Sequence, residues 1–347
     1  VVTTGSGSDT VIGDSGEINY DAAVITDLQS TATDQGGDDS ITALGGDNTI
    51  VGGFGGDTIT TTNGNDAILG DNGRIEYVDG QAVRLSSNDD EVATTGTDII
   101  TAGSGDNRIL AGLSDDDVTT LGGADVVLGD NGELTYVNNV LTHAVSTETS
   151  LGGVDTIAAG EGDNIVIAGQ GADTVTTGSG SDTVMGDNGE ISYGLDGVTI
   201  QSTAADQGGD DSITALGGDN TIVGGFGGDT ITTAGGNDAI LGDSGELSYV
   251  GDDLTSAEST SASLGGVDTI AVGEGDNIVI AGQGADMVTT GSGSDTVIGD
   301  SGEINYDLNG VITDLQSTAA DQGGDDSITA LGGDNTIVGG FGGDTIT

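Results

Sequence analysis

A nine-residue period constrains the fold of this chain more than any other feature of its sequence. It is clearest in Gly52–Thr60, which reads GGFGGDTIT, with an aspartate sixth and an isoleucine eighth. Glycine is suited to a turn that needs positive φ, and the last three residues read as a very short strand with one inward aliphatic residue. The sixth position is Asp or Asn in 24 such units, and Ile or Val always follows two residues later. The sequence therefore predicts an all-β solenoid in which these aliphatic residues form the inward-facing row of a parallel strand stack.

A second period of about 57 residues is marked by the pattern Gly-Asp-Asn/Ser-Gly-x-Ile/Leu-x-Tyr, which we call the closing turn. After each closing turn comes a stretch without the nine-residue period, and several carry Asp-Gly or Asn-Gly between alternating apolar residues, which indicates a β-hairpin. We expect repeat blocks at 34–77, 93–136, 150–193, 206–249 and 263–306, the end of a block at 1–20 and the start of one at 321–347. The hairpin connections are then 21–33, 78–92, 137–149, 194–205, 250–262 and 307–320.

The side on which these hairpins project is open at this stage. If a hairpin replaces a half-coil, all hairpins leave one side of the stack, and if it is a pure insertion they alternate. Because Val1 and Thr347 both interrupt a repeat, we expect the chain to be a window of a longer repetitive protein.

The charge of the chain is extreme, with 59 acidic residues, three arginines, no lysine and a net charge of −56. Nucleic acid is a poor partner for such a chain, and no apolar run approaches the 18 residues of a membrane span. A single His, no Cys and no Lys leave no catalytic constellation, so we expect no enzyme activity. Disorder is the simplest reading of the composition, but the regular apolar spacing argues against it.

Stacked nonapeptides would place equivalent aspartates about 4.8 Å apart, where unneutralised carboxylates repel one another. Calcium accepts six to eight oxygens from carboxylates and backbone carbonyls in a flexible geometry, whereas magnesium demands a rigid octahedron and zinc prefers His or Cys. We therefore expect several calcium ions, about one per turn, with the sixth-position aspartates as ligands: Asp9, Asp39, Asp57, Asp66, Asp98, Asp116, Asp125, Asp155, Asp173, Asp182, Asp211, Asp229, Asp238, Asp268, Asp286, Asp295, Asp326 and Asp344.

Two further sets of side chains are candidates with an alternative left open. Six turns carry asparagine in the sixth position, either as a ligand or as a metal-free turn with left-handed asparagine: Asn48, Asn107, Asn164, Asn220, Asn277 and Asn335. The closing-turn aspartates are either ligands or simple turn formers: Asp14, Asp71, Asp130, Asp187, Asp243 and Asp300.

Gly52–Thr60 resembles the RTX (repeats-in-toxin) nonapeptide, and about three quarters of the chain shares this pattern, although few turns keep both leading glycines. The resemblance implies a parallel β-roll with one coil per two nonapeptides and calcium in both rows of turns. It also implies type I secretion and folding outside the cell, where calcium is plentiful. We expect the calcium-free chain to be unfolded.

The expected function is structural: a calcium-stiffened extracellular rod, fibre or surface matrix of a large secreted bacterial protein, with copies of itself as partners. One alternative is a stalk within a giant RTX adhesin. A second is the secretion and folding module of an RTX toxin or hydrolase.

Overall fold

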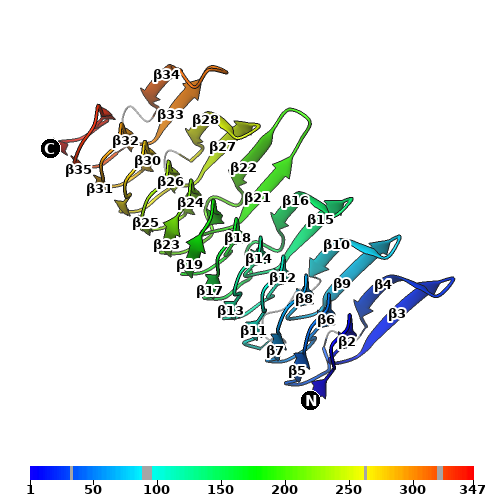
Figure 1. Ribbon diagram of the computed structural model, residues 1–347. Coiled ribbons are helices and arrows are strands. Elements are labelled where there is room, and N and C mark those ends of the chain that lie inside the picture. Colours follow the sequence, from blue (N-terminus) through cyan, green and yellow to red (C-terminus); the bar gives the residue numbers. More distant parts are fainter. Residues whose placement is uncertain (32–33, 88–95, 262–263, 319–322) are drawn as a thin grey trace. The chain divides into compact units, whose positions relative to one another are not determined.

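The computed structural model describes residues 1–31, 34–87, 96–261, 264–318 and 323–347. The chain divides into two units, Val1–Gln170 and Gly171–Thr347, and each is treated by itself. Every element assigned in the described residues is a β-strand, and each unit holds three sheets (Figure 1). We call them sheet A, sheet B and the hairpin sheet.

In unit 1, nonapeptides alternate between two parallel sheets, so that two nonapeptides complete one coil. Sheet A contains β1 (Val2–Thr3), β5 (Ser40–Ala43), β7 (Thr58–Thr61), β11 (Ile99–Thr101), β13 (Asp117–Thr119) and β17 (Thr156–Ala159). Sheet B contains β2 (Thr10–Ile12), β6 (Thr49–Val51), β8 (Ala67–Leu69), β12 (Arg108–Leu110), β14 (Val126–Leu128) and β18 (Ile165–Ile167). Two coils lie between successive hairpins, as the implied β-roll requires.

Unit 2 repeats this arrangement. Its sheet A contains β19 (Thr174–Ser179), β23 (Ser212–Gly217), β25 (Thr230–Thr233), β29 (Thr269–Ala271), β31 (Met287–Thr290), β35 (Ser327–Ala330) and β37 (Thr345–Ile346). Its sheet B contains β20 (Thr183–Met185), β24 (Thr221–Gly225), β26 (Ala239–Asp243), β30 (Ile278–Gly282), β32 (Thr296–Asp300) and β36 (Thr336–Val338).

The core is the eighth-position ladder. In sheet A of unit 1, Ile59 pairs in register with Ile41 on one side and Ile100 on the other, and all three are fully buried. Ile50 and Ile68 are the matching buried pair in sheet B. The prediction that these residues face inward is confirmed, and in the four-residue strands the residue two positions later, such as Ala43 or Thr61, lies on the same buried face.

The predicted hairpins form a third, antiparallel sheet. In unit 1 it contains β3 (Gly16–Asp21), β4 (Val24–Ser30), β9 (Gly73–Val78), β10 (Gln81–Ser87), β15 (Gly132–Val137) and β16 (Val140–Ser146). In unit 2 it contains β21 (Gly189–Tyr193), β22 (Val198–Ser202), β27 (Gly245–Val250), β28 (Asp253–Ser259), β33 (Gly302–Tyr306) and β34 (Ile312–Ser317). Asp79-Gly80 and Asn138-Asn139 make their two-residue turns with positive φ, as such hairpins require.

Neighbouring hairpins also pair with one another, which answers the open question of side. In unit 1, Leu28 on β4 pairs with Ile75 on β9, and Leu85 on β10 pairs with Leu134 on β15. All four side chains are fully buried. Such pairing requires the hairpins of a unit to project from one side of its coils, and Figure 1 shows them arranged in this way within each unit.

The proposed repeat blocks place the first strand of each hairpin, with its tyrosine, at the end of a block. The boundaries at 92–93, 262–263 and 320–321, and the end of the first connection at 33, lie outside the described residues. Nothing in the described part of the chain forms a helix with the length and apolar character to cross a bilayer.

Candidate metal centre

The fold sorts the sixth-position residues into two rows. Row A contains the turns that lead into sheet A, and every sixth residue in it is an aspartate: Asp39, Asp57, Asp98, Asp116 and Asp155 in unit 1, and Asp173, Asp211, Asp229, Asp268, Asp286, Asp326 and Asp344 in unit 2. Row B contains the turns that lead into sheet B, and its sixth residues alternate: Asp9, Asn48, Asp66, Asn107, Asp125 and Asn164, then Asp182, Asn220, Asp238, Asn277, Asp295 and Asn335.

In row A each carboxylate joins two coils. The backbone N–H of Asp39 donates to Asp57 Oδ1 at 2.7 Å, and the N–H of Asp57 donates to Asp98 Oδ1 at 2.7 Å. The same bond recurs along unit 2, for example from Asp211 N to Asp229 Oδ1 at 2.8 Å. One oxygen of each of these carboxylates thus accepts a hydrogen bond that holds neighbouring coils together.

The second carboxylate oxygen of most row A aspartates is buried and has no hydrogen-bond donor. Asp57, for example, is 1 % exposed, and its Oδ2 contacts no donor. The same holds for Oδ2 of Asp116, Asp211, Asp229, Asp268, Asp286 and Asp326. Burying an ionised oxygen without a partner raises the free energy of the folded state, so a cation bound beside these oxygens would stabilise the fold.

Glycines keep the surroundings of these oxygens open. A Cβ at Gly52 would lie 2.3 Å from Asp57 Oδ2 and 2.3 Å from the carbonyl oxygen of Gly70 on the following coil. A Cβ at Gly224 would lie 2.4 Å from Asp229 Oδ2 and 2.1 Å from the Gly242 carbonyl oxygen. Glycine at these two positions leaves a carboxylate oxygen and a carbonyl oxygen from successive coils facing the same space. Carboxylate and carbonyl oxygens together are the donor set that calcium prefers.

The closing-turn aspartates also reach row A. Asp14 Oδ2 accepts the backbone N–H of Phe54 at 2.8 Å, forty residues further along the chain, and a backbone hydrogen bond from Gly37. Equivalent bonds run from Leu113 N to Asp71 Oδ2, from Gly153 N and Gln170 N to Asp130, from Gly209 N and Phe226 N to Asp187, from Gly266 N and Gln283 N to Asp243, and from Gly324 N and Phe341 N to Asp300. They are thus more than local turn formers, because each ties its hairpin to row A turns.

The burial and close spacing of these carboxyl groups raise the pKa values of several of them in the metal-free fold. Burial, reinforced by the neighbouring carboxylates of Asp187 and Asp229, raises the pKa of Asp211 to about 10. Burial likewise raises the pKa of Asp57 to about 7 and that of Asp243 to about 8. A cation bound among these oxygens would favour their charged form and remove this penalty.

Row B is built differently. Asn48 Nδ2 donates to Asp66 Oδ1 and to the carbonyl oxygen of Gly46, both at 2.8 Å. Asn48 Oδ1 accepts the backbone N–H of Asp9 at 3.1 Å. None of the six row B asparagines has the left-handed backbone that the metal-free alternative assumed. The distinction between the rows was not predicted, although the alternation of Asp and Asn is legible once nonapeptides are assigned to alternate sheets.

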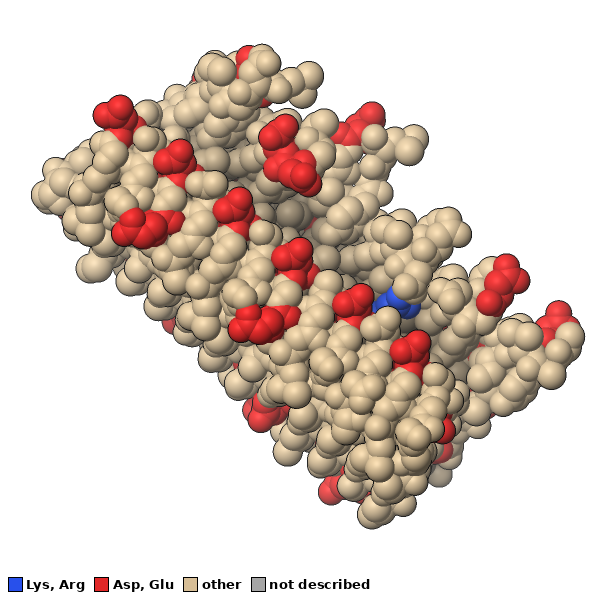
Figure 2. Space-filling view, in the orientation of Figure 1, with Lys and Arg blue, Asp and Glu red and all other residues tan. Residues whose placement is uncertain are grey.

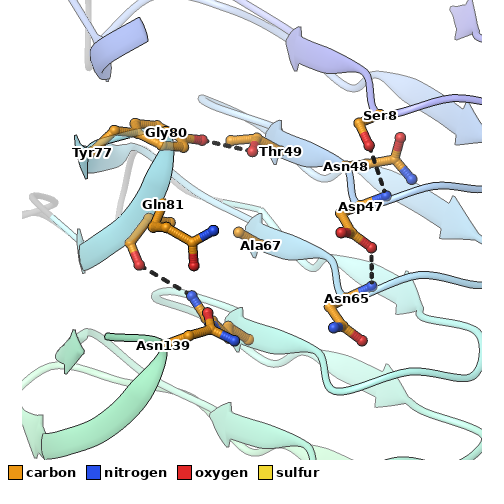
Figure 3. Close-up of a pocket in the computed structure, with 12 residues that line it drawn as sticks. Ser8, Asp47, Asn48, Thr49, Asn65, Ala67, Tyr77, Gly80, Gln81 and Asn139 are labelled. Atoms are coloured by element: carbon orange, nitrogen blue, oxygen red, sulfur yellow. Dashed lines mark hydrogen bonds between the residues drawn. The ribbon is translucent and has the colours of Figure 1, made fainter. Parts of the chain in front are cut away.

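A cavity of about 290 Å³ lies between row B and the hairpin sheet of unit 1 (Figure 3). Tyr77 on β9 closes one wall and bonds Thr49 at 2.6 Å, Oη to Oγ1. Arg108 on β12 donates to the carbonyl of Ala82 at 3.2 Å and lies 3.8 Å from the ring centre of Tyr136. Sequence reasoning gave Arg108 no role, and in the structure it ties a sheet B strand to two hairpins.

Within the described residues, no three His, Cys, Asp or Glu side chains gather into a chelating cluster. Acidic side chains are spread over the visible face, with few basic ones (Figure 2).

Comparison with protein families agrees with this geometry. The model of the RTX calcium-binding nonapeptide repeat (4 copies) matches residues 1–17, 31–59, 42–74, 92–132, 150–189, 214–246, 264–302 and 318–346. No curated protein and no solved structure matches the chain. Because the matched segments cover well over half of its length, the chain belongs to the family of RTX calcium-binding nonapeptide repeats, and multiple calcium ions are expected in its turns.

Proposed function

We propose that this chain is a calcium-stiffened structural region of a secreted protein, and that row A holds the calcium. The observation that carries the proposal is the set of buried Oδ2 atoms without donors in turns of this one row, at Asp57, Asp116, Asp211, Asp229, Asp268, Asp286 and Asp326. The sixth-position aspartates of row A would be the ligands, together with glycine carbonyls such as those of Gly52 and Gly70. Closing-turn aspartates such as Asp14 would add negative charge to the row A sites from the side of the hairpins.

Calcium would then supply the folding energy. The metal-free stack must confine buried carboxylates and order 68 glycines around a thin aliphatic core, whereas each bound ion cancels two charges. One ion in each of the twelve row A turns would cancel about 24 of the 56 net negative charges. Low calcium inside a cell and high calcium outside it would make folding follow export, which supports an extracellular location.

Far-UV circular dichroism in calcium and in excess EGTA tests this part of the proposal. We expect a β-sheet spectrum with calcium and a disordered spectrum with EGTA, restored by adding calcium back. Magnesium at the same concentration is the control and should not restore it, since it holds its waters and prefers a rigid octahedron. A full β-sheet spectrum in EGTA would refute the proposal.

The role in a fibre or matrix rests on the hairpins. Their tips expose apolar side chains in a chain that otherwise presents many acids: Tyr20, Val137, Val140, Leu195 and Leu308. Exposed apolar groups repeated at each hairpin support lateral association of copies of this chain. Electron microscopy should show filaments or sheets in calcium that disappear with chelator. Single, unassociated particles at all concentrations would instead favour a stalk that carries binding domains elsewhere.

A further inference from the structure

Row B departs from the expectation that both rows of turns hold calcium. Along this row every second sixth-position residue is an asparagine, and the residue five positions before it changes in step. Before an aspartate of row B that residue is always threonine, as in Thr61 for Asp66. Before an asparagine it is alanine or, once, valine, as in Ala43 for Asn48. Two kinds of contact between coils therefore alternate along the row.

In the first kind, the asparagine amide stands between two oxygens that a cation would otherwise bridge. Asn48 Nδ2 bonds a carboxylate oxygen of the following coil, Asp66 Oδ1, and a backbone carbonyl of its own turn, Gly46 O. Both partners are acceptors only, so the amide group must point its nitrogen at them. Its own oxygen faces the donating N–H of Asp9. The uncharged amide thereby pairs with three polar groups.

The same pair of amide hydrogen bonds recurs in three other asparagine turns of row B. Asn107 Nδ2 bonds Asp125 Oδ1 and Gly105 O, at 2.8 and 2.9 Å, in unit 1. In unit 2, Asn220 Nδ2 bonds Asp238 Oδ1 and Gly218 O, and Asn277 Nδ2 bonds Asp295 Oδ1 and Gly275 O. Figure 3 shows this row from its outer side, where Asp47 and Asn65 continue the ladder: the Asn65 N–H donates to Asp47 Oδ1 at 2.9 Å.

In the second kind of contact, the residue five positions before the aspartate is a threonine, which row A does not have at this position. Thr233 Oγ1 donates to Asp238 Oδ2 at 2.6 Å, and Gly273 N donates to the same hydroxyl at 3.4 Å. A hydroxyl bond from Thr120 lowers the pKa of Asp125 against the burial that raises it. In other turns the threonine holds the same position without this bond: Oδ2 of Asp9, Asp66 and Asp295 has no donor, and the hydroxyls of Thr4 and Thr290 have no partner.

The charge of the two rows differs accordingly. For each pair of coils, row A carries two sixth-position aspartates and is joined by one closing-turn aspartate, such as Asp57, Asp98 and Asp71. Row B carries one aspartate and one neutral asparagine. Repulsion between adjacent carboxylates is thus built into row A and diluted in row B.

We infer that calcium is confined to row A, where carboxylates are adjacent, and that row B, in which every second carboxylate is replaced by asparagine, is held together without metal mainly by the asparagine amides. This rests on the proposed function, since it presumes that row A binds calcium. It would remove Asp9, Asp66, Asp125, Asp182, Asp238 and Asp295, and the six asparagines, from the predicted ligands. The bound ions would then number close to the twelve row A turns rather than the 24 turns of both rows.

Two matched sets of substitutions test the inference. One changes all six row B aspartates to asparagine. The other changes six alternate row A aspartates to asparagine, Asp57, Asp116, Asp173, Asp229, Asp286 and Asp344, which gives row A the alternation of row B. Both sets remove the same charge and keep the side-chain shape. Bound calcium is counted by elemental analysis after equilibrium dialysis, together with the β-sheet signal.

We expect the wild-type chain to bind about twelve ions and the row B set to bind the same number, whereas the row A set loses about half of them. Loss of ions from the row B set, or near 24 ions in the wild type, would overturn the inference while leaving calcium-dependent folding intact. If the row A set does not fold, the wild-type count and the row B set still decide. A wild-type chain that binds no calcium would instead refute the proposed function.

Discussion

Replacing Gly242 by alanine tests the row A site at a single atom, in a closing-turn position that is glycine in all six copies. The new Cβ would lie 2.1 Å from the carbonyl oxygen of Ala281 and 2.4 Å from Asp268 Oδ2. Since real Cβ contacts stop near 3.0 Å, the carbonyl must move by about 0.9 Å, and both displaced oxygens are of the types proposed as calcium ligands. Overpacking of this kind costs about 1–3 kcal/mol. We therefore expect a lower free energy of unfolding and weaker calcium binding.

The matched control is Gly217→Ala, in the same unit and leading into a row B turn. A Cβ there meets no atom within 4 Å, and neither glycine has the positive φ that disfavours alanine. This control should be neutral or gain about 0.4–1 kcal/mol through the unfolded state. Urea unfolding in saturating calcium, with calcium titrations of the circular dichroism signal, compares the two. Equal urea midpoints and equal calcium midpoints would refute the assignment of these oxygens.

Three further predictions concern the whole fold. Burial, with repulsion from neighbouring carboxylates, raises the pKa of Asp211 and Asp268 in the metal-free fold to about 10, above the unfolded value of 3.8. The free-energy cost of folding without calcium is therefore smallest near pH 4 and grows as the pH rises toward 10. Acidifying an EGTA-treated sample from about pH 8 to about pH 4 should then increase its β-sheet circular dichroism signal. An unchanged or smaller signal would contradict this prediction. Ile231→Ala, in a fully buried ladder position, should cost about 2–5 kcal/mol in urea unfolding, and a cost near zero would argue against the inward ladder. Ala23→Gly should raise the thermal midpoint, because Ala23 has a φ of 68° in the first hairpin turn and relief of left-handed strain is worth about 1 kcal/mol; a lower midpoint would count against that turn.

Much of the site was predictable because the nine-residue period is local. Asp57 and Ile59 are two residues apart on one short strand and its turn, so one points to the turn and the other to the core wherever the coil repeats. The hairpins were also predictable, since Asp79-Gly80 and its flanking apolar residues specify a turn within a few residues. Composition alone also argues against a structural zinc site, because the chain has one His and no Cys.

Three features depended on tertiary structure because they join residues about forty or more positions apart. The hairpins lie on one side because Leu85 pairs with Leu134, a contact that depends on two full coils fitting between them. Asp14 reaches Phe54 because the closing turn lies beside row A, which no local pattern reveals. The sequence by itself determined a calcium-binding β-solenoid with an aspartate in most turns. The tertiary structure decided which turns are alike, because alternate nonapeptides enter different sheets. Similar sequence motifs therefore form two different rows of turns, with glycines beside buried carboxylates in row A and asparagine amides between coils in row B.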